Sequence, residues 1–389
     1  MAQASTRTSQ RDPLWLRLGC LATALGVVGI GALCTGLNGL SMGLMAPGHF
    51  VLAVILATAF TLPYSILLRT IDRNEPEPRW LLALTFLWGA VVATAISGLF
   101  NDAMGNLLAL VFPPWLADQM TASFSAPFIE EITKGSALAV LVVAFRHHFD
   151  NVLDGILYGA FIGLGFAWFE NIYYYVTWGV DAGVVEMIKL SYVRGFLNGI
   201  ASHAAYTGLV GLGFGLWRVM RSGWLRWLMP PLFLVIAMAA HFAWNSFAGV
   251  VVGLSTTSEL ASYVIGLPLA VALLQAPFVM MLVFISVFAL RHEDQLIHLF
   301  LESEADDVLP AALRGQLAPA RRRMANGVAR LFKRGPGAWW RARTQERLLI
   351  ELAFAKWHHK RDQHAWHLDE DDDVRRLRAR LVQLSDAWK

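Results

Sequence analysis

The sequence predicts an all-α membrane protein, a polytopic bundle of about eight transmembrane helices with a soluble helical C-terminal tail. Hydrophobic residues fill 56% of the 389 positions and the mean hydropathy is +0.48, whereas soluble domains average about 45–50% apolar residues. Apolar runs of about 20 residues, long enough to cross a bilayer as helices, recur up to residue 290. These runs lack the two-residue alternation that is typical of a membrane β-barrel.

Eight apolar segments make up the predicted transmembrane domain, residues 16–290. Each is long enough to form one membrane-crossing helix. The segments are 16–36, 50–69, 80–100, 123–145, 155–177, 191–217, 227–252 and 262–290. Between the second and third segments, Pro76 and Pro78 predict an extended connection that ends both helices.

Basic residues flank these segments on alternate sides of the membrane. Arginines precede the first segment and recur in the second, fourth and sixth connections, whereas the other connections hold mostly acids. Positive charge is retained on the cytoplasmic side of a membrane. We therefore predict a multi-pass protein of the cell membrane, in contact with its lipids, with both termini in the cytoplasm and a short N-terminal segment, residues 1–15.

The predicted cytoplasmic tail, residues 291–389, carries most of the charge. It holds 19 Lys/Arg and 15 Asp/Glu, compared with 13 and 14 in residues 1–290. Residues 321–343 include eight Lys/Arg and no acid, which favours contact with anionic lipid or with a cytoplasmic protein. No nucleic-acid partner is expected, because no recognised binding motif accompanies this charge.

The fourth segment places two adjacent carboxylates and a lysine, Glu130, Glu131 and Lys134, in an otherwise apolar run. A charge near the middle of a spanning helix costs roughly 2.5–3.5 kcal/mol on insertion scales. One interpretation is an internal ion pair between Glu130 and Lys134, one helical turn apart, that only stabilises helix packing. The other is a buried cavity in which these charges carry out chemistry.

Three later segments also bring polar side chains into the bilayer. Glu170 lies in the fifth segment, Arg194 and His203 in the sixth, and His241 in the seventh. At 1.5 Å per residue, we expect Glu130, Glu170, His203 and His241 to lie within a slab about 8 Å thick in the outer half of the bilayer.

Two histidines and two or three carboxylates at one depth match the ligands of a catalytic metal site, with zinc favoured. We assign Glu130 as the proton acceptor, His203, His241 and Glu170 as metal ligands, and Asn245, one turn after His241, as a hydrogen-bond donor to the oxyanion. A metal-free mechanism, in which Glu and His activate water directly, stays open.

Glu131 has a catalytic role in this hypothesis, and Lys134, Arg194 and Asn171 have supporting roles. Glu131 can exchange roles with Glu130 or Glu170 and belongs to the predicted catalytic set. Lys134 and Arg194 would balance the charge or orient the carboxylates.

Four motifs on successive helices, with the proline-rich turn before them, resemble those of the PrsW family of intramembrane proteases. That family is similar to the CAAX prenyl endopeptidases and their bacterial relatives, which have a His where Glu170 stands here. The resemblance covers roughly residues 50–290 and rests on Asp72–Pro78, Glu130-Glu131-x-x-Lys134, Phe166-x-x-x-Glu170-Asn171, His203 and His241-x-x-x-Asn245. It implies glutamate- and histidine-dependent cleavage of a single-span membrane protein, such as an anti-sigma factor, on the extracytoplasmic side.

Two hypotheses from other functional classes compete with proteolysis. A proton- or ion-coupled transporter also uses intramembrane Glu and His, although such proteins commonly show inverted repeats, and the sequence shows no convincing repeat. A noncatalytic membrane scaffold that recruits partners through its tail is the third hypothesis.

Overall fold

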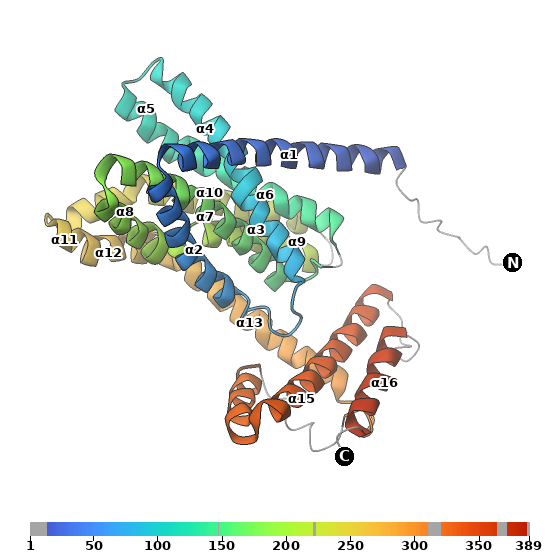
Figure 1. Cartoon of the computed structure of the whole chain (residues 1–389). Coiled ribbons are helices and arrows are strands. Elements are labelled where there is room, and N and C mark those ends of the chain that lie inside the picture. The colour runs from blue at the N-terminus through green and yellow to red at the C-terminus, as the bar shows by residue number, and fades with distance from the viewer. Residues whose placement is uncertain (1–13, 147, 221–222, 310–319, 364–371, 387–389) are drawn as a thin grey trace.

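Every element in the described part of the chain is helical, which confirms the all-α prediction (Figure 1). The structure is a computed structural model, and it describes residues 14–146, 148–220, 223–309, 320–363 and 372–386. The first half of the membrane-embedded bundle consists of α1 (Leu14–Met45), α2 (Pro47–Leu68), α3 (Arg79–Leu87), η1 (Trp88–Ala93), α4 (Thr94–Ala109), α5 (Pro114–Met120), η2 (Thr121–Ser125) and α6 (Ala126–Ala144).

The second half of the bundle is also helical in the described residues and is followed by the tail. Its elements are α7 (Val152–Ala182), α8 (Val184–Ser191), η3 (Tyr192–Asn198), η4 (Gly199–Ala201), α9 (His203–Val219), α10 (Trp224–Ser255), α11 (Glu259–Ala261), η5 (Ser262–Gly266), α12 (Leu267–Leu274) and α13 (Ala276–Leu301). The tail adds α15 (Ala320–Gln363), which has a non-helical kink at Gly335, and α16 (Asp372–Asp386).

All eight predicted segments coincide with helical structure, but two of them are interrupted. The sixth is broken between η3 and α9, and the eighth is broken at Gln275, between α12 and α13. Among the described residues, six helices are long and apolar enough to cross a membrane by themselves. The other two predicted segments correspond to α6, which carries the buried charges, and to α9, which has 17 residues.

Helix α7 lies at the centre of the bundle, with every residue from Leu153 to Ala167 buried. Its glycines let α9 approach to backbone contact: a Cβ on Gly159 would lie 2.3 Å from Thr207 O, and one on Gly163 would lie 2.1 Å from His203 O. From the other side, a Cβ on Gly211 would lie 1.9 Å from Gly155 O. Small residues at four-residue spacing are a common basis for close helix packing in membranes. This contact holds the start of α9, and His203 with it, against α7.

The tail packs against the end of the bundle that carries the α2–α3 loop, residues 69–78. His358 of α15 lies between two carboxylates, with Nε2 2.7 Å from Glu75 Oε1 and Nδ1 3.2 Å from Asp150 Oδ2. In the same loop, Asn74 donates to Glu293 Oε2 over 3.0 Å and accepts from Arg323. The proline-rich loop is therefore covered by the tail and is not simply a solvated turn.

The α2–α3 loop holds a buried carboxyl group, Glu77, and a half-buried one, Asp72. Burial raises the pKa of Asp72 to about 7 and the pKa of Glu77 to about 8. Glu77 accepts a hydrogen bond from Tyr158 of α7, and its backbone N–H donates to Asp72 Oδ2 over 2.6 Å. Ionisation at neutral pH thus opposes the packing of this loop.

We predict that Gly211→Ala destabilises the bundle, because the added methyl group would have to separate α7 and α9. Overpacking of this kind typically costs about 1–3 kcal/mol. Thermal unfolding in detergent micelles should show a lower midpoint than the wild type. The matched control is Gly98→Ala on α4, where a Cβ meets nothing within 4 Å. An equal midpoint for both variants would contradict the close-packing account.

We predict that the α2–α3 loop loosens as pH rises through 7 and 8. Both acids have a folded-state pKa above the ordinary value, so their stabilising contribution is present at low pH and is lost as they ionise. Hydrogen exchange of residues 69–78, corrected for intrinsic rates, should be faster at pH 9 than at pH 6. Glu77→Gln should reduce this difference, and an unchanged pH dependence in that variant would contradict the assignment.

Candidate active site

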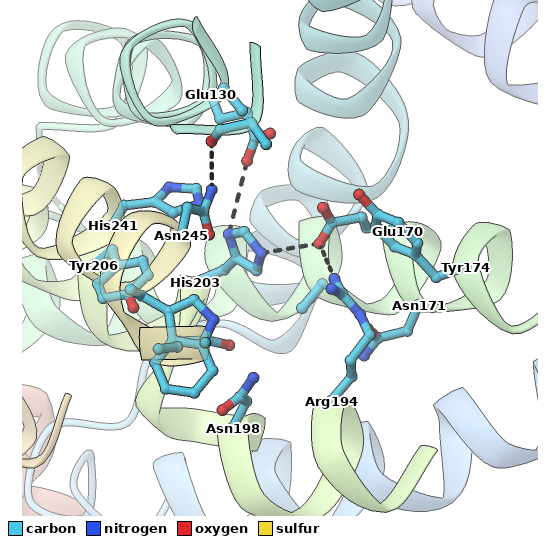
Figure 2. A pocket seen from close by; sticks show the side chains of 17 residues that line it. Glu130, Glu170, Asn171, Tyr174, Arg194, Asn198, His203, Tyr206, His241 and Asn245 are labelled. Atoms are coloured by element: carbon cyan, nitrogen blue, oxygen red, sulfur yellow. Dashed lines mark hydrogen bonds and ion pairs between the residues drawn. The ribbon is translucent and has the colours of Figure 1, made fainter. Parts of the chain in front are cut away.

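A cavity of about 310 Å³ lies between η2, α6, α7, η3, α9 and α10 (Figure 2). Its wall brings together all four polar side chains that the sequence places at one depth. They are Glu130, Glu170, His203 and His241. The other expected residues in the wall are Asn171, Arg194 and Asn245, whereas Glu131 and Lys134 lie behind it.

Glu131 and Lys134 are both completely buried and form the core of the charged cluster. Lys134 Nζ lies 2.6 Å from Glu131 Oε1 and 3.7 Å from Glu130 Oε2. On a helix, Lys134 can reach both Glu131, three residues before it, and Glu130, four residues before it. The expected pair with Glu130 is present, but it is longer than the contact with Glu131.

The imidazole of His241 is oriented by this buried carboxylate. Its Nδ1 lies 3.0 Å from Glu131 Oε1. A carboxylate only accepts hydrogen bonds, so Nδ1 donates and the lone pair is on Nε2. Tyr206 of α9 stacks on the same ring, with centroids 5.1 Å apart and an interplanar angle of 20°. Carboxylate–histidine pairs of this kind orient metal-binding imidazoles.

The second imidazole, His203, is oriented from the opposite direction. Its Nε2 lies 2.9 Å from Glu170 Oε2 and donates to that carboxylate. The remaining Nδ1 faces Lys134 Nζ at 3.0 Å and Glu130 Oε2 at 3.9 Å. Glu170 is fixed in turn by Arg194, whose Nη2 is 2.6 Å away. Arg194 Nε donates to Asn171 Oδ1 over 2.8 Å, which explains why Asn171 accompanies the motif.

Glu130 faces the two imidazoles with an oxygen that lacks a hydrogen bond. Its Oε2 is buried and has no hydrogen-bond partner, while Oε1 is 3.5 Å from Asn101 Nδ2. Donor atoms of Glu130, His203 and His241 all lie within 4.8 Å of one another. Two imidazoles and a carboxylate suit a divalent cation, and these residues fit such an ion once Lys134 Nζ gives up His203 Nδ1, which it contacts at 3.0 Å.

The geometry differs from the expected roles at two positions. Glu170 contacts the face of His203 that points away from Glu130, so Glu130 is the better-placed third donor. Asn245 lines the cavity, but its Nδ2 donates to Ala122 O of η2 over 2.7 Å. It can donate to a substrate oxygen only after exchanging this partner.

Sequence reasoning gave no role to several cavity residues, among them Tyr206 and Asn198, or to one neighbour of Glu130. Tyr206 and Asn198 line the cavity, and Asn101 of α4 contacts Glu130 from behind. Tyr206 could have been found from its position three residues after His203, on the same helical face. Asn101 carries no such signal, because its place depends on how α4 packs against α6.

Comparison with known proteins identifies the same region. The sequence profile of the family described as PrsW family intramembrane metalloprotease matches residues 77–287, which is more than half of the chain. No solved structure matches this one significantly.

Three curated relatives share parts of the sequence, and each is named Protease PrsW. The protein of Geobacillus kaustophilus (strain HTA426) is 30% identical over 145 residues, 37% of this chain and 57% of its own length. That of Oceanobacillus iheyensis (strain DSM 14371) is 29% identical over 147 residues, 36% and 57% of the two chains. That of Bacillus subtilis (strain 168) is 36% identical over 88 residues, 21% and 40% of the two chains.

The match therefore spans a little over half of the length of the first two relatives. The family profile, in contrast, extends across every charged residue of the cavity, from Glu130 to His241. On this basis the protein belongs to the PrsW family of intramembrane metalloproteases.

Proposed function

We propose that this protein is an intramembrane endopeptidase that hydrolyses peptide bonds of single-span membrane proteins. The observation that carries the proposal is the cluster of Glu130, His203 and His241, whose donor atoms lie within 4.8 Å of one another in a cavity among membrane-crossing helices. Charged and ionisable groups at such positions are functional by default, because they are costly to keep there. The family to which the chain belongs supports the same chemistry.

The cluster is the proposed site of a divalent cation, with zinc favoured because the donors are imidazole and carboxylate. Glu130, His203 and His241 would hold the ion. When bound, it polarises the substrate carbonyl and makes water more acidic. An ion bound to His203 Nδ1 would replace Lys134 at that nitrogen. Lys134 would then keep its ion pair with Glu131.

Glu130 would hold the ion through Oε2 alone, which leaves its other oxygen, Oε1, as the proposed proton acceptor in the hydrolysis. Its Oε2 faces the imidazoles, whereas Oε1 lies on the Asn101 side. Water adds to the peptide carbonyl carbon as Glu130 accepts one of its protons. The C–N bond then breaks as the carboxyl returns that proton to the leaving nitrogen, so atoms and charges balance over the cycle.

The other charged residues position the histidines and do not contact the reacting atoms. Glu131 fixes the tautomer of His241, and Glu170 with Arg194 fixes that of His203. Asn245, at the cavity wall, is the proposed donor to the developing oxyanion once its bond to Ala122 O is released.

The location and the substrate follow from the charge pattern and the family. The Arg-rich connections would face the cytoplasm, which puts both termini on that side of the cell membrane and the cavity in the outer half of the bilayer. A substrate resembling an anti-sigma factor would be cut near its extracytoplasmic end. The tail would contact anionic lipid or a cytoplasmic protein through the basic residues 321–343.

We predict that Glu130→Gln and His241→Ala each lower kcat/KM for a single-span substrate by at least about 100-fold, because a positioned proton acceptor contributes 10²–10⁴-fold. The assay is cleavage in proteoliposomes. Glu186→Gln is the matched control: Glu186 pairs with Lys189 at the surface, outside the cavity. Retained cleavage in both cavity variants, at normal expression, would exclude the proposed reaction centre.

We predict that metal content separates the roles of the two carboxylates. Purified His203→Ala and Glu130→Gln should lose zinc, whereas Glu170→Gln should keep it at saturating zinc with affinity lower by about 10–100-fold, as for a residue that orients a ligand. Elemental analysis after dialysis against defined free zinc measures this. Zinc lost from Glu170→Gln but retained by Glu130→Gln would restore the assignment expected from the sequence.

A further inference from the structure

The helix that leads into α9 is broken where it borders the cavity. It passes from η3 to η4 and restarts at His203, with Gly199 at φ +27° and ψ −112°. A Cβ at Gly199 would lie 2.5 Å from the Tyr64 hydroxyl oxygen, so only glycine fits. Within a membrane, irregular backbone persists only where protein buries it or where it lines a cavity. The break therefore belongs to the cavity wall.

The last residue of η3, Asn198, has a buried polar group without a partner. Its side chain lines the cavity and the residue is only 7% exposed. Asn198 Oδ1 is fully buried and accepts no hydrogen bond within the described protein. An unsatisfied buried acceptor costs about 1–3 kcal/mol. Its neighbour Ser202 is engaged, because its hydroxyl donates to Gly199 O over 3.1 Å.

Asn198 lies apart from the proposed reaction centre. Figure 2 shows it in the same cavity as Glu130, with His203 between them and Arg194 beside it. None of the contacts that orient the two histidines involves Asn198. Asn198 is thus a residue of the cavity wall that takes no part in holding the charged cluster, and a small turn of its side chain would bring the unpartnered Oδ1 to the cavity.

We propose that Asn198 is a subsite for the main chain of the substrate, an inference that rests on the proposed protease function. A peptide bond inside a helix has its N–H and C=O groups paired within the helix, so the segment to be cut has to unwind. Unwinding frees main-chain groups that are costly to leave unpaired away from water. The carboxamide of Asn198 carries one acceptor and two donors, and so it can pair with an extended peptide as another strand would.

The ligand of this subsite is therefore an unwound, extended stretch of a membrane-spanning peptide, bound through a backbone N–H that donates to Asn198 Oδ1. Recognition through the main chain depends little on the substrate side chains. Because the helix is broken here, the substrate segment would meet the Asn198 amide at this point of the cavity wall, where an intact helix would present only another turn.

The test is a double-mutant cycle between the protein and the substrate backbone. Single amide-to-ester replacements, which remove one N–H each, are made along a short transmembrane peptide substrate. Binding to Glu130→Gln, which keeps the peptide intact, and cleavage by the active protein are both measured. Asn198→Ala, Asn198→Asp and the control Ser286→Ala are compared with wild type, because Ser286 Oγ is also buried and unpartnered but lies outside the cavity wall.

We expect Asn198→Ala to raise KM and the dissociation constant by about 10-fold, equivalent to about 1.4 kcal/mol, with kcat changed less than about 3-fold. One ester position should weaken binding to the wild type by a similar factor. The same ester should leave binding to Asn198→Ala unchanged. Asn198→Asp keeps an acceptor oxygen, so the effect of that ester should persist there. Ser286→Ala should bind and cleave as wild type does.

Two outcomes would overturn the inference. If every ester has the same effect in wild type and Asn198→Ala, the side chain does not contact the substrate main chain. If Asn198→Ala lowers kcat with KM unchanged, its role lies in the reaction centre. Failure of the wild type to cut any peptide would instead reject the proposed function. If Asn198→Ala does not fold, wild type is compared with Asn198→Asp alone. If the sensitive ester no longer weakens binding to Asn198→Asp, Oδ1 does not accept a hydrogen bond from the substrate main chain.

Discussion

The buried contact between Glu131 and Lys134 is the constraint on which the arrangement of the cavity depends. Burial costs each ion several kcal/mol of hydration free energy. Removing one partner leaves the other charge buried and unpaired, which destabilises a protein by about 3–5 kcal/mol. Glu131 offsets this cost with three partners: Lys134 at 2.6 Å, His241 at 3.0 Å and the Thr207 hydroxyl at 3.4 Å. The same lysine also reaches His203 Nδ1 at 3.0 Å. One ion pair on α6 thereby sets the positions of imidazoles on two other helices.

This arrangement requires close packing of the helices that carry the imidazoles. The glycines of α7 bring the backbone of α9 into direct contact, and a Cβ at Gly163 would collide with the carbonyl of His203. Because His203 begins α9 immediately after a break, its position depends on this contact as much as on its own helix. The break also presents Asn198 to the cavity. Close packing at glycine fixes the start of α9, and the break before it puts a buried polar side chain in the cavity wall.

Much of the fold follows from composition and spacing, and less of the site does. Apolar runs predicted the membrane-crossing helices because a bilayer demands a fixed length of apolar chain, and the family resemblance is confirmed by the profile match. The break at Gln275 and the docking of His358 between Glu75 and Asp150 were not predicted, because both depend on contacts between segments far apart in the chain. The choice between Glu130 and Glu170 as third donor likewise depends on which side of His203 each one reaches, and helical spacing does not determine this.

The most direct measurement of the central claim is kcat/KM for Glu130→Gln, His241→Ala and the double variant in the same membrane preparation. Groups that act as one catalytic unit show strongly non-additive losses. If Glu130 and His241 serve one reaction centre, the double variant should be about as slow as the slower single variant. Losses that multiply, so that the double variant falls by the product of the two single effects, would contradict a shared centre.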